Sequence, residues 1–384
     1  MSHGLDLHLT PEQRELYEHT RRLAAQTLKP IADTGPPDRV NRPLIEALAD
    51  HGLLERMFAN DRAIPALELC LIREALAREC TEAETAFALQ GLGAHPIAQA
   101  GRPQIRGEWI PRVAAGTAVA AFALTEPDAG SDVSAISLRA EPDGDGYRLS
   151  GEKLWISNAP EADIYTVFAR STDGGGARGL TAFAVPGDSA GLTGEPKRLL
   201  APHAIGSLQF DEVPVTAGQV LGDPGAGFRV AMRTLDLFRP SVGAFAIGMA
   251  RTALALATDW ALTRRTFGKP LGEHQAVSHR LAEISTRVEA ARLLVHHAAA
   301  AHDAGTPDTS LAAMAKLLAT ETAQEAVDAA VQFHGARALE RGHPLEHLYR
   351  EVRAPRIYEG ATEIQREIIA RALFRAAERG QPLH

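Results

Sequence analysis

The spacing of apolar residues changes twice along the chain. Residues 1–119 carry apolar positions at helical intervals, interrupted by proline and glycine. Between residues 120 and 227 the pattern shortens to apolar runs of strand length, separated by turns rich in glycine and aspartate. Long helical patterns return over residues 228–384. We therefore predict an α+β protein with an N-terminal α-helical domain, a middle antiparallel β-barrel or β-sandwich domain, and a C-terminal four-helix-bundle domain.

The first helix has a well-defined start signal. Thr10 is followed by Pro11 and Gln13, which matches an N-cap, a proline at the first helical position and the glutamine of a capping box. Further helices are expected before residue 119. They cover roughly residues 43–52, 65–80, 83–91 and a short stretch after Pro103.

The middle region predicts strands without intervening helices. It therefore differs from a Rossmann unit, in which strands and helices alternate and a glycine-rich turn joins them. The predicted strands cover residues 119–124, 147–149, 153–157, 164–170, 180–185 and 207–213.

The C-terminal region predicts a helical bundle. Between residues 273 and 303 apolar positions recur in steps of four and three, which is typical of a helix that packs along a bundle seam. These positions are Val277, Leu281, Ile284, Val288, Ala291 and Val295. Further helices are predicted over residues 309–333, 345–352 and 362–377. For the last helix, Thr362 and Gln365 predict a capping box, and a buried stripe is expected from Ile364, Ile368, Ile369 and Leu373.

Composition places the chain among ordinary soluble proteins. It has 384 residues, 45% of them hydrophobic and 23% charged, and a net charge of −8. An acidic surface argues against nucleic acid or an anionic membrane as a partner. The apolar run at residues 242–262 is interrupted by Arg251 and Asp259, so we interpret it as a buried helix and not as a membrane span.

Cysteine and histidine usage adds little chemistry. The only cysteines are Cys70 and Cys80, ten residues apart in one predicted helix, and neither a disulfide nor a metal site is expected from them. The fifteen histidines do not suggest a metal site either. With no apolar leader at the N-terminus, the expected location is a reducing cytoplasm.

Three motifs carry the candidate chemistry. Residues 125–132 read TEPDAGSD, residues 155–158 read WISN, and residues 358–360 read YEG. Taken alone, Glu359 is typical of a surface carboxylate favoured by the dipole of the helix that follows it. Together the motifs resemble the acyl-CoA dehydrogenase family over nearly the whole chain. That resemblance implies that Glu359 is the catalytic base and that FAD is the cofactor.

The reaction itself requires a cofactor. Removing hydrogen from the carbons α and β to a thioester needs a base for the α proton, hydrogen bonds that polarise the carbonyl, and an acceptor for the β hydride. No side chain accepts a hydride. The resemblance implies that flavin N5 takes it, that the thioester oxygen accepts from the Glu359 N–H and a flavin ribityl hydroxyl, and that the product is the trans-2-enoyl thioester.

The resemblance also implies a set of cofactor contacts. Thr125 and Ser157 match flavin-contacting hydroxyls, with Ser157 near N5, and Trp155 matches an aromatic residue beside the ring. A single hydroxyl of this kind is more typical of a turn or strand hydrogen bond. The other implied positions are Phe122, Leu124, Arg264, Phe267, Gln275, Gln332, Gly335, Ala336, Ala361 and Glu363. Among them, Arg264 and the Gln332 segment match groups that reach the cofactor of a neighbouring subunit, and Ala336 replaces a family glycine.

Substrate contacts follow from the same resemblance. The matched positions are Ser131, Asp236, Arg239, Tyr358 and Gly360, with a helix-surface ion pair as the alternative for Asp236 and Arg239. Some family members carry the base at the position that is Phe238 here, which cannot accept a proton, so Glu359 is the remaining candidate. Glu84 and Gln90 are candidates for the end of the acyl pocket, with solvent exposure as the alternative.

The resulting hypothesis is a homotetrameric acyl-CoA dehydrogenase, a dimer of dimers, reoxidised by an electron-transfer flavoprotein. The domain boundaries expected for it are residues 1–119, 120–227 and 228–384. Alternatives within the family are an acyl-CoA oxidase, an enzyme that eliminates a leaving group, and an enzyme of carrier-protein thioesters. A non-catalytic protein that binds flavin or acyl-CoA is the alternative outside catalysis.

Overall fold

The computed structural model describes residues 9–58, 64–171 and 176–380. The chain divides into two compact units. The helical unit comprises Met1–Gln26, Pro65–Thr81 and Asp236–His384, and the sheet unit comprises Thr27–Ile64 and Glu82–Leu235. Two of the N-terminal helices therefore group with the C-terminal helices, and the remaining ones group with the strands.

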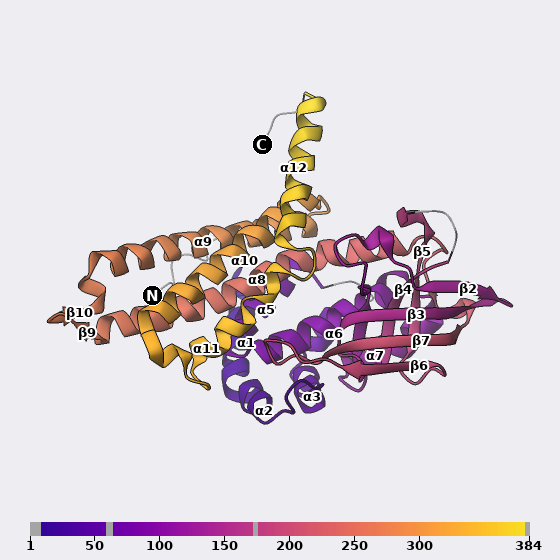
Figure 1. Ribbon diagram of the computed structural model, residues 1–384, viewed down its shortest axis with the longest axis horizontal. Helices are drawn as coiled ribbons and strands as arrows, with labels where there is room; N and C mark the ends of the chain where they lie inside the picture. The colour runs from indigo at the N-terminus through magenta and orange to yellow at the C-terminus, as the bar shows by residue number, and fades with distance from the viewer. Residues whose placement is uncertain (1–8, 59–63, 172–175, 381–384) are drawn as a thin grey trace. The chain divides into compact units, whose positions relative to one another are not determined.

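The helical unit is built from long helices joined by short connections. Its helices are α1 (Pro11–Leu23), α5 (Ala66–Glu79), α9 (Gln275–Asp303), α10 (Thr309–His334), α11 (Pro344–Glu351), α12 (Thr362–Glu378) and the greater part of α8 (Gly227–Thr263). Helices α9 and α10 run side by side in Figure 1. The predicted seam of α9 is confirmed, because its positions are buried except for Leu281, which is half-buried.

The start of α1 follows its sequence signal. The Thr10 hydroxyl accepts from the Gln13 N–H at 3.2 Å, and the Gln13 side chain accepts from the Thr10 N–H at 2.9 Å. The predicted capping box is therefore confirmed.

A buried ionic cluster holds α5 in the helical unit. Glu74 is fully buried, and Arg292 Nε lies 2.9 Å from both of its carboxylate oxygens. The Tyr17 hydroxyl donates to the same carboxylate at 3.1 Å, and Arg251 also donates to it. Burial alone would raise the pKa of Glu74, but the two guanidinium charges outweigh it and hold the pKa well below its usual range. Because Arg73 directly precedes Glu74 on α5, this cluster also fixes a cation that acts on the candidate site.

The sheet unit contains shorter helices around a single sheet. Its helices are α2 (Lys29–Asp33), α3 (Arg42–Asp50), α4 (Leu53–Met57), α6 (Thr81–Ala100) and α7 (Pro103–Ala114). Helix α6 continues well beyond the predicted end at residue 91 and passes through Pro96. It approaches the sheet most closely at Gly93, whose carbonyl accepts from the Thr166 hydroxyl at 2.8 Å. A Cβ atom at residue 93 would lie 2.5 Å from the Ala121 nitrogen, which explains the glycine.

The sheet follows the order β6-β7-β3-β2-β4-β5-β8, with β1 pairing to β4. The strands are β1 (Ala120–Ala123), β2 (Arg139–Asp143), β3 (Gly146–Ser157), β4 (Ile164–Arg170), β5 (Leu180–Pro186), β6 (Leu192–Pro196), β7 (Ile205–Val215) and β8 (Val220–Leu221). Most strand pairs are antiparallel, as predicted, but β1 runs parallel to β4. The two segments predicted at 147–149 and 153–157 form one strand, β3, with irregular register against β7.

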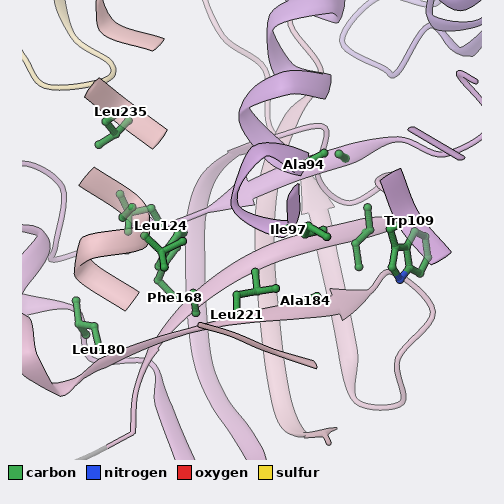
Figure 2. Close-up of a cluster of buried hydrophobic side chains, with 14 of the residues drawn as sticks. Ala94, Ile97, Trp109, Leu124, Phe168, Leu180, Ala184, Leu221 and Leu235 are labelled. Carbon is green, nitrogen blue, oxygen red and sulfur yellow. The ribbon is translucent and has the colours of Figure 1, made fainter. Parts of the chain in front are cut away.

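The sheet and its helices share a hydrophobic core, part of which Figure 2 shows. Ala94 and Ile97 from α6 and Trp109 from α7 pack in the same cluster as Phe168 and Leu180 from the strands. The predicted fold class is therefore confirmed as helical regions on either side of a middle β-sheet region. Two of the strands that the sequence did not predict, β2 and β6, are largely exposed and lack an apolar run.

The apolar run at residues 242–262 lies within α8. By length and composition α8 meets the criterion for a membrane span, yet 67% of its most apolar window is buried inside the protein. The interpretation as a buried core helix is therefore confirmed. Cys70 and Cys80 are both buried and unbridged, although Cys80 caps the end of α5 and does not lie within it.

Candidate active site

Glu359 lies on a strained turn that precedes α12. Its φ is 51°, and the φ of Gly360 is 92°, so two consecutive residues adopt the left-handed region. A residue with a Cβ is strained there by about 1–3 kcal/mol, so the surrounding contacts must hold the turn. A Cβ atom at residue 360 would also approach the Gln365 side-chain nitrogen to 2.5 Å.

The predicted capping box at this turn is wrong. The N-cap of α12 is Ala361 and makes no side-chain cap. Thr362 instead donates to Glu321 of α10 at 2.9 Å, and Gln365 donates to the Gly360 carbonyl at 2.8 Å. Both side chains that the sequence assigned to the cap therefore bind other groups, one on α10 and one in the turn itself.

The prediction that α12 buries an apolar stripe is also wrong within a single chain. Ile364, Ile368 and Ile369 are only half-buried, and Leu373 is 39% exposed. The reason is that only the first turns of α12 lie against α10, while the rest of α12 projects from the helical unit in Figure 1.

Two side chains of α10 hold the turn. The ammonium group of Lys316 donates to the Tyr358 carbonyl at 2.8 Å and to the Gly360 carbonyl at 2.6 Å. Glu321 accepts from Arg356 at 3.0 Å as well as from Thr362. The turn is thereby anchored before, around and after Glu359.

The surroundings of the Glu359 carboxyl are desolvated but electrically positive. Burial raises the pKa of Glu359 above its usual value, and the charges of Arg73, Lys316 and Arg239 offset part of that increase. Arg73 is fixed by donating to the buried Ser241 hydroxyl at 2.7 Å. The structure thus brings three cations to the predicted base.

Two polar groups of Glu359 have no protein partner. Its Oε2 atom is buried without a hydrogen bond, and no acceptor for its backbone N–H occurs within residues 9–58, 64–171 and 176–380. Buried polar groups are normally paired, so the unpaired Oε2 atom, on the same residue as a backbone donor without a partner, indicates a place for a ligand.

The other predicted substrate residues of the helical unit surround this turn or lie on α8. Arg239 pairs with Asp236 at 2.9 Å, but the guanidinium is almost entirely buried, so a surface ion pair does not describe it. Burial raises the pKa of Asp236 against the opposing charge of Arg239. Phe238 is buried and its carbonyl accepts from Ser241 at 2.7 Å.

In the sheet unit a buried ion pair fixes the loop that carries Thr125. Lys153 of β3 is fully buried and donates to the Leu124 carbonyl at 2.9 Å and to Glu126 at 2.8 Å. Glu126 also accepts from the backbone N–H groups of Ser137 and Leu138. Burial lowers the pKa of Lys153 to about 8 despite the Glu126 charge. Burial would raise the pKa of Glu126, but Lys153 and these hydrogen bonds lower it.

Next to this pair, β3 presents an aromatic side chain. Trp155 adopts φ 59° and is 50% exposed, and the half-buried Ser157 follows two residues later. Thr125 and Phe122 are also half-buried, while Leu124 is buried. A large exposed indole beside hydroxyl groups provides the kind of surface that a flat ring covers. Ser131 is exposed. The Ala129 N–H donates to the Glu126 carbonyl within the same loop.

A second group of predicted cofactor residues lies at the other end of α8. Arg264 is exposed and lies over the Trp260 ring at 5.8 Å, and Trp260 stacks on His334 with ring centres 5.0 Å apart. Phe267 is 96% exposed at the tip of the hairpin formed by β9 (Arg265–Thr266) and β10 (Lys269–Pro270). The contacts of Trp260 therefore bring the Arg264 turn beside the segment that contains Gln332, Gly335 and Ala336, all exposed. Gln275 and Glu363 are exposed and Ala361 is half-buried.

The candidates for the pocket end are not solvent-exposed. Gln90 is fully buried and its amide bridges the Ala118 carbonyl and the Ala120 N–H, each at 2.8 Å. It therefore connects α6 to β1. Glu84 is also buried. No group of three or more metal-binding side chains occurs in the described part of the chain.

Sequence reasoning missed the buried cations. Lys316, Lys153 and Arg73 have no motif of their own. Glu126 lies within the TEPDAGSD motif, but its pairing with Lys153 was not predicted. One signal was available: Lys316 lies within the apolar run Ala312–Ala319, and Lys153 occupies an inward position of a strand. A charged side chain on a buried face needs an oppositely charged or hydrogen-bonding partner, so such a residue indicates a polar site inside the protein.

Models of the acyl-CoA dehydrogenase family match three consecutive segments of the chain. The N-terminal domain matches residues 10–117, the middle domain residues 121–213 and the C-terminal domain residues 225–374. The protein therefore belongs to the acyl-CoA dehydrogenase family and is an oxidoreductase that acts on CH–CH bonds.

Full-length similarity supports this membership. Cyclohexane-1-carbonyl-CoA dehydrogenase of Geobacter metallireducens is 34% identical, covering 95% of this chain and 98% of that protein. Butyryl-CoA dehydrogenase of Megasphaera elsdenii superposes with a TM-score of 0.89 at 32% identity, over 95% of this chain and 99% of that one. Glutaryl-CoA dehydrogenase of Mycobacterium smegmatis in complex with FADH2 superposes with a TM-score of 0.89 at 25% identity, over 96% of each chain.

The cofactor is FAD, as in family structures that contain it. The residues present fit this group. The exposed Trp155 indole offers a flat apolar surface, and the exposed Phe267 and the cation of Arg264 suit a ring and a phosphate. Which residues touch FAD remains a prediction.

We expect Lys153→Met to release part of the bound FAD and to destabilise the protein by about 3–5 kcal/mol, because it leaves the Glu126 carboxylate buried without its cation. The double variant Lys153→Met, Glu126→Gln should recover part of the stability, since no uncompensated charge remains. Urea unfolding and the flavin absorbance of the purified protein measure both effects. Equal stability of Lys153→Met and wild type would contradict this role of the pair.

Proposed function

We propose that the protein dehydrogenates an acyl-CoA thioester between the α and β carbons to give the trans-2-enoyl-CoA, with Glu359 as the base. The observation that carries the proposal is the unpaired, buried Oε2 atom of Glu359 on a turn that is otherwise anchored on both sides. A carboxylate in this state is free to accept a proton from a bound carbon acid.

Each group near the turn has a role in this proposal. Glu359 Oε2 takes the α proton, and the unused Glu359 N–H donates to the thioester oxygen, which polarises the carbonyl. Arg73, Lys316 and Arg239 favour the charged form of the base. The flavin supplies the acceptor for the β hydride at N5 when it is bound. Ser157 and Thr125 are proposed to bind it, and Trp155 to pack beside its ring.

Ser131, Asp236, Arg239, Tyr358 and Gly360 are proposed as substrate contacts. The relatives named above act, by their names, on cyclohexane-1-carbonyl, butyryl and glutaryl thioesters, so the acyl group has to be found by testing a panel of acyl-CoAs. The family alternatives predict other outcomes. Fast reoxidation by oxygen would indicate an oxidase, and absence of flavin bleaching by any acyl-CoA would indicate a binding protein. We propose an electron-transfer flavoprotein as the physiological acceptor.

A homotetramer is proposed from the distance, within the helical unit, between the surroundings of Glu359 and the Arg264 group. Arg239 lies in the surroundings of Glu359, and α8 continues for 24 residues from 239 to its end at Thr263, next to Arg264. At about 1.5 Å per residue this separation is about 36 Å. Because the flavin has to lie beside the base in this proposal, a separation of this size supports the assignment of the Arg264 group to the FAD of a neighbouring subunit.

Arg264→Ala should lower FAD retention while the protein keeps its fold, because the substitution removes one exposed cation and no buried contact. Arg198→Ala is a matched control, since the Arg198 side chain is 91% exposed and lies outside the proposed site. Flavin content and light scattering of the purified variants measure the effect. A monomeric wild-type protein that retains all its flavin would contradict the proposed assembly.

Glu359→Gln should retain FAD and bind acyl-CoA but lose most of its turnover, roughly 10²–10⁴-fold, because the amide keeps the shape and lacks the basicity. In the wild type only the carboxylate is active and its pKa is raised, so the rate should increase with pH through a group that titrates above an ordinary glutamate. Anaerobic flavin reduction in a stopped-flow instrument measures both. Wild-type turnover by Glu359→Gln would place the base elsewhere.

A further inference from the structure

Lys316 has an unusual environment for a lysine. It is fully buried in the middle of α10, and its ammonium group donates to two backbone carbonyls, those of Tyr358 and Gly360. These carbonyls lie directly before and after Glu359. Burial lowers the pKa of Lys316 to about 8, while the nearby Glu359 charge opposes that shift.

The two hydrogen bonds act where the backbone is strained. Glu359 and Gly360 both have positive φ, at 51° and 92°. Without external contacts a turn of this kind would relax, since each such non-glycine residue costs about 1–3 kcal/mol. Gln365 provides a second donor to the Gly360 carbonyl at 2.8 Å, and its contact with the Glu359 carbonyl is longer, at 3.4 Å. Lys316 is thus the donor from α10 that fixes the carbonyls on both sides of Glu359.

Lys316 favours the ionised form of Glu359 without forming a hydrogen bond to its Oε2 atom. The Oε2 atom of Glu359 has no hydrogen-bond partner, although the charge of Lys316 favours the ionised form of Glu359. A direct ion pair would occupy the oxygen that has to accept a proton. Directing the ammonium to the carbonyls on either side keeps that oxygen available and still places a positive charge beside it.

We propose that Lys316 is the positioning residue of the catalytic base: it fixes the turn that presents Glu359 and favours the carboxylate form through space. This inference rests on the proposed role of Glu359. The other charged groups that act on this pair are Arg73 of α5, Arg239 of α8 and Glu321 of α10.

The test uses Lys316→Met, which keeps an apolar chain of similar length and removes both the charge and the donors. The limiting rate of anaerobic flavin reduction should fall roughly 10- to 100-fold, as expected for a displaced catalytic group, with little change in acyl-CoA affinity. The increase of rate with pH should also move to higher pH, because Glu359 loses a cation that favours its charged form. Lys29→Met is the matched control, since Lys29 is exposed on α2, and it should leave both quantities unchanged.

A second readout does not depend on catalysis. Hydrogen–deuterium exchange of the holoenzyme should become faster at residues 357–362 in Lys316→Met and remain unchanged in Lys29→Met. If Lys316→Met does not fold with FAD, Lys316→Gln and Lys316→Arg provide the comparison. The arginine variant retains the charge and should keep the wild-type pH profile, whereas the glutamine variant should shift it. Identical profiles for the two variants would overturn the proposal.

The outcomes separate the inference from the function on which it rests. If Glu359→Gln is inert while Lys316→Met shows the wild-type exchange and pH profile, the positioning role is wrong and the base assignment stands. If Glu359→Gln keeps wild-type turnover, the base assignment is wrong, and with it the catalytic part of this proposal. Faster exchange in Lys316→Met would then show only that the lysine holds the turn.

Discussion

The candidate site depends on keeping a carboxylate charged in a partly desolvated place without pairing it. Burial disfavours the anion at Glu359, and Arg73, Lys316 and Arg239 favour it. Their fixed positions follow from the packing of the helical unit. Arg73 is held by Ser241 and lies next to the buried Glu74 cluster on α5, while Lys316 is buried in α10. The long helices thus serve the site by bringing buried cations to one strained turn.

The sheet unit also contains a buried lysine that fixes backbone groups, but there it forms an ion pair. Lys153 and Glu126 form a buried pair whose remaining hydrogen-bonding capacity goes to backbone groups of the loop that carries Thr125. In both units a buried lysine therefore fixes a backbone segment next to predicted functional residues. The difference is that Lys153 is paired with a carboxylate, whereas the oxygen of Glu359 is left unpaired. A structural carboxylate is stabilised by such a pair, whereas a base needs an oxygen that is free to accept a proton.

Local signals predicted local structure well. The Thr10 capping box and the α9 seam formed as expected, because each depends on residues within a few turns of one another. The same kind of signal failed at Thr362, where Glu321 and the Gly360 carbonyl engage the two side chains instead. The strands β2 and β6 and the parallel β1–β4 pairing were also missed, because exposed strands and long-range register leave little trace in periodicity. Glu359 could be singled out from its motif, but the cations around it come from α5, α8 and α10.

The central claim is that Glu359 removes the α proton. It is tested most directly with an acyl-CoA analogue in which sulfur replaces the β carbon, since such a compound can lose its α proton but has no β hydride to give. Binding to the wild-type holoenzyme should produce a long-wavelength charge-transfer absorbance between the enolate and the flavin, stronger at higher pH. The account predicts that this absorbance is absent in Glu359→Gln with the analogue still bound. An undiminished absorbance in that variant would contradict it.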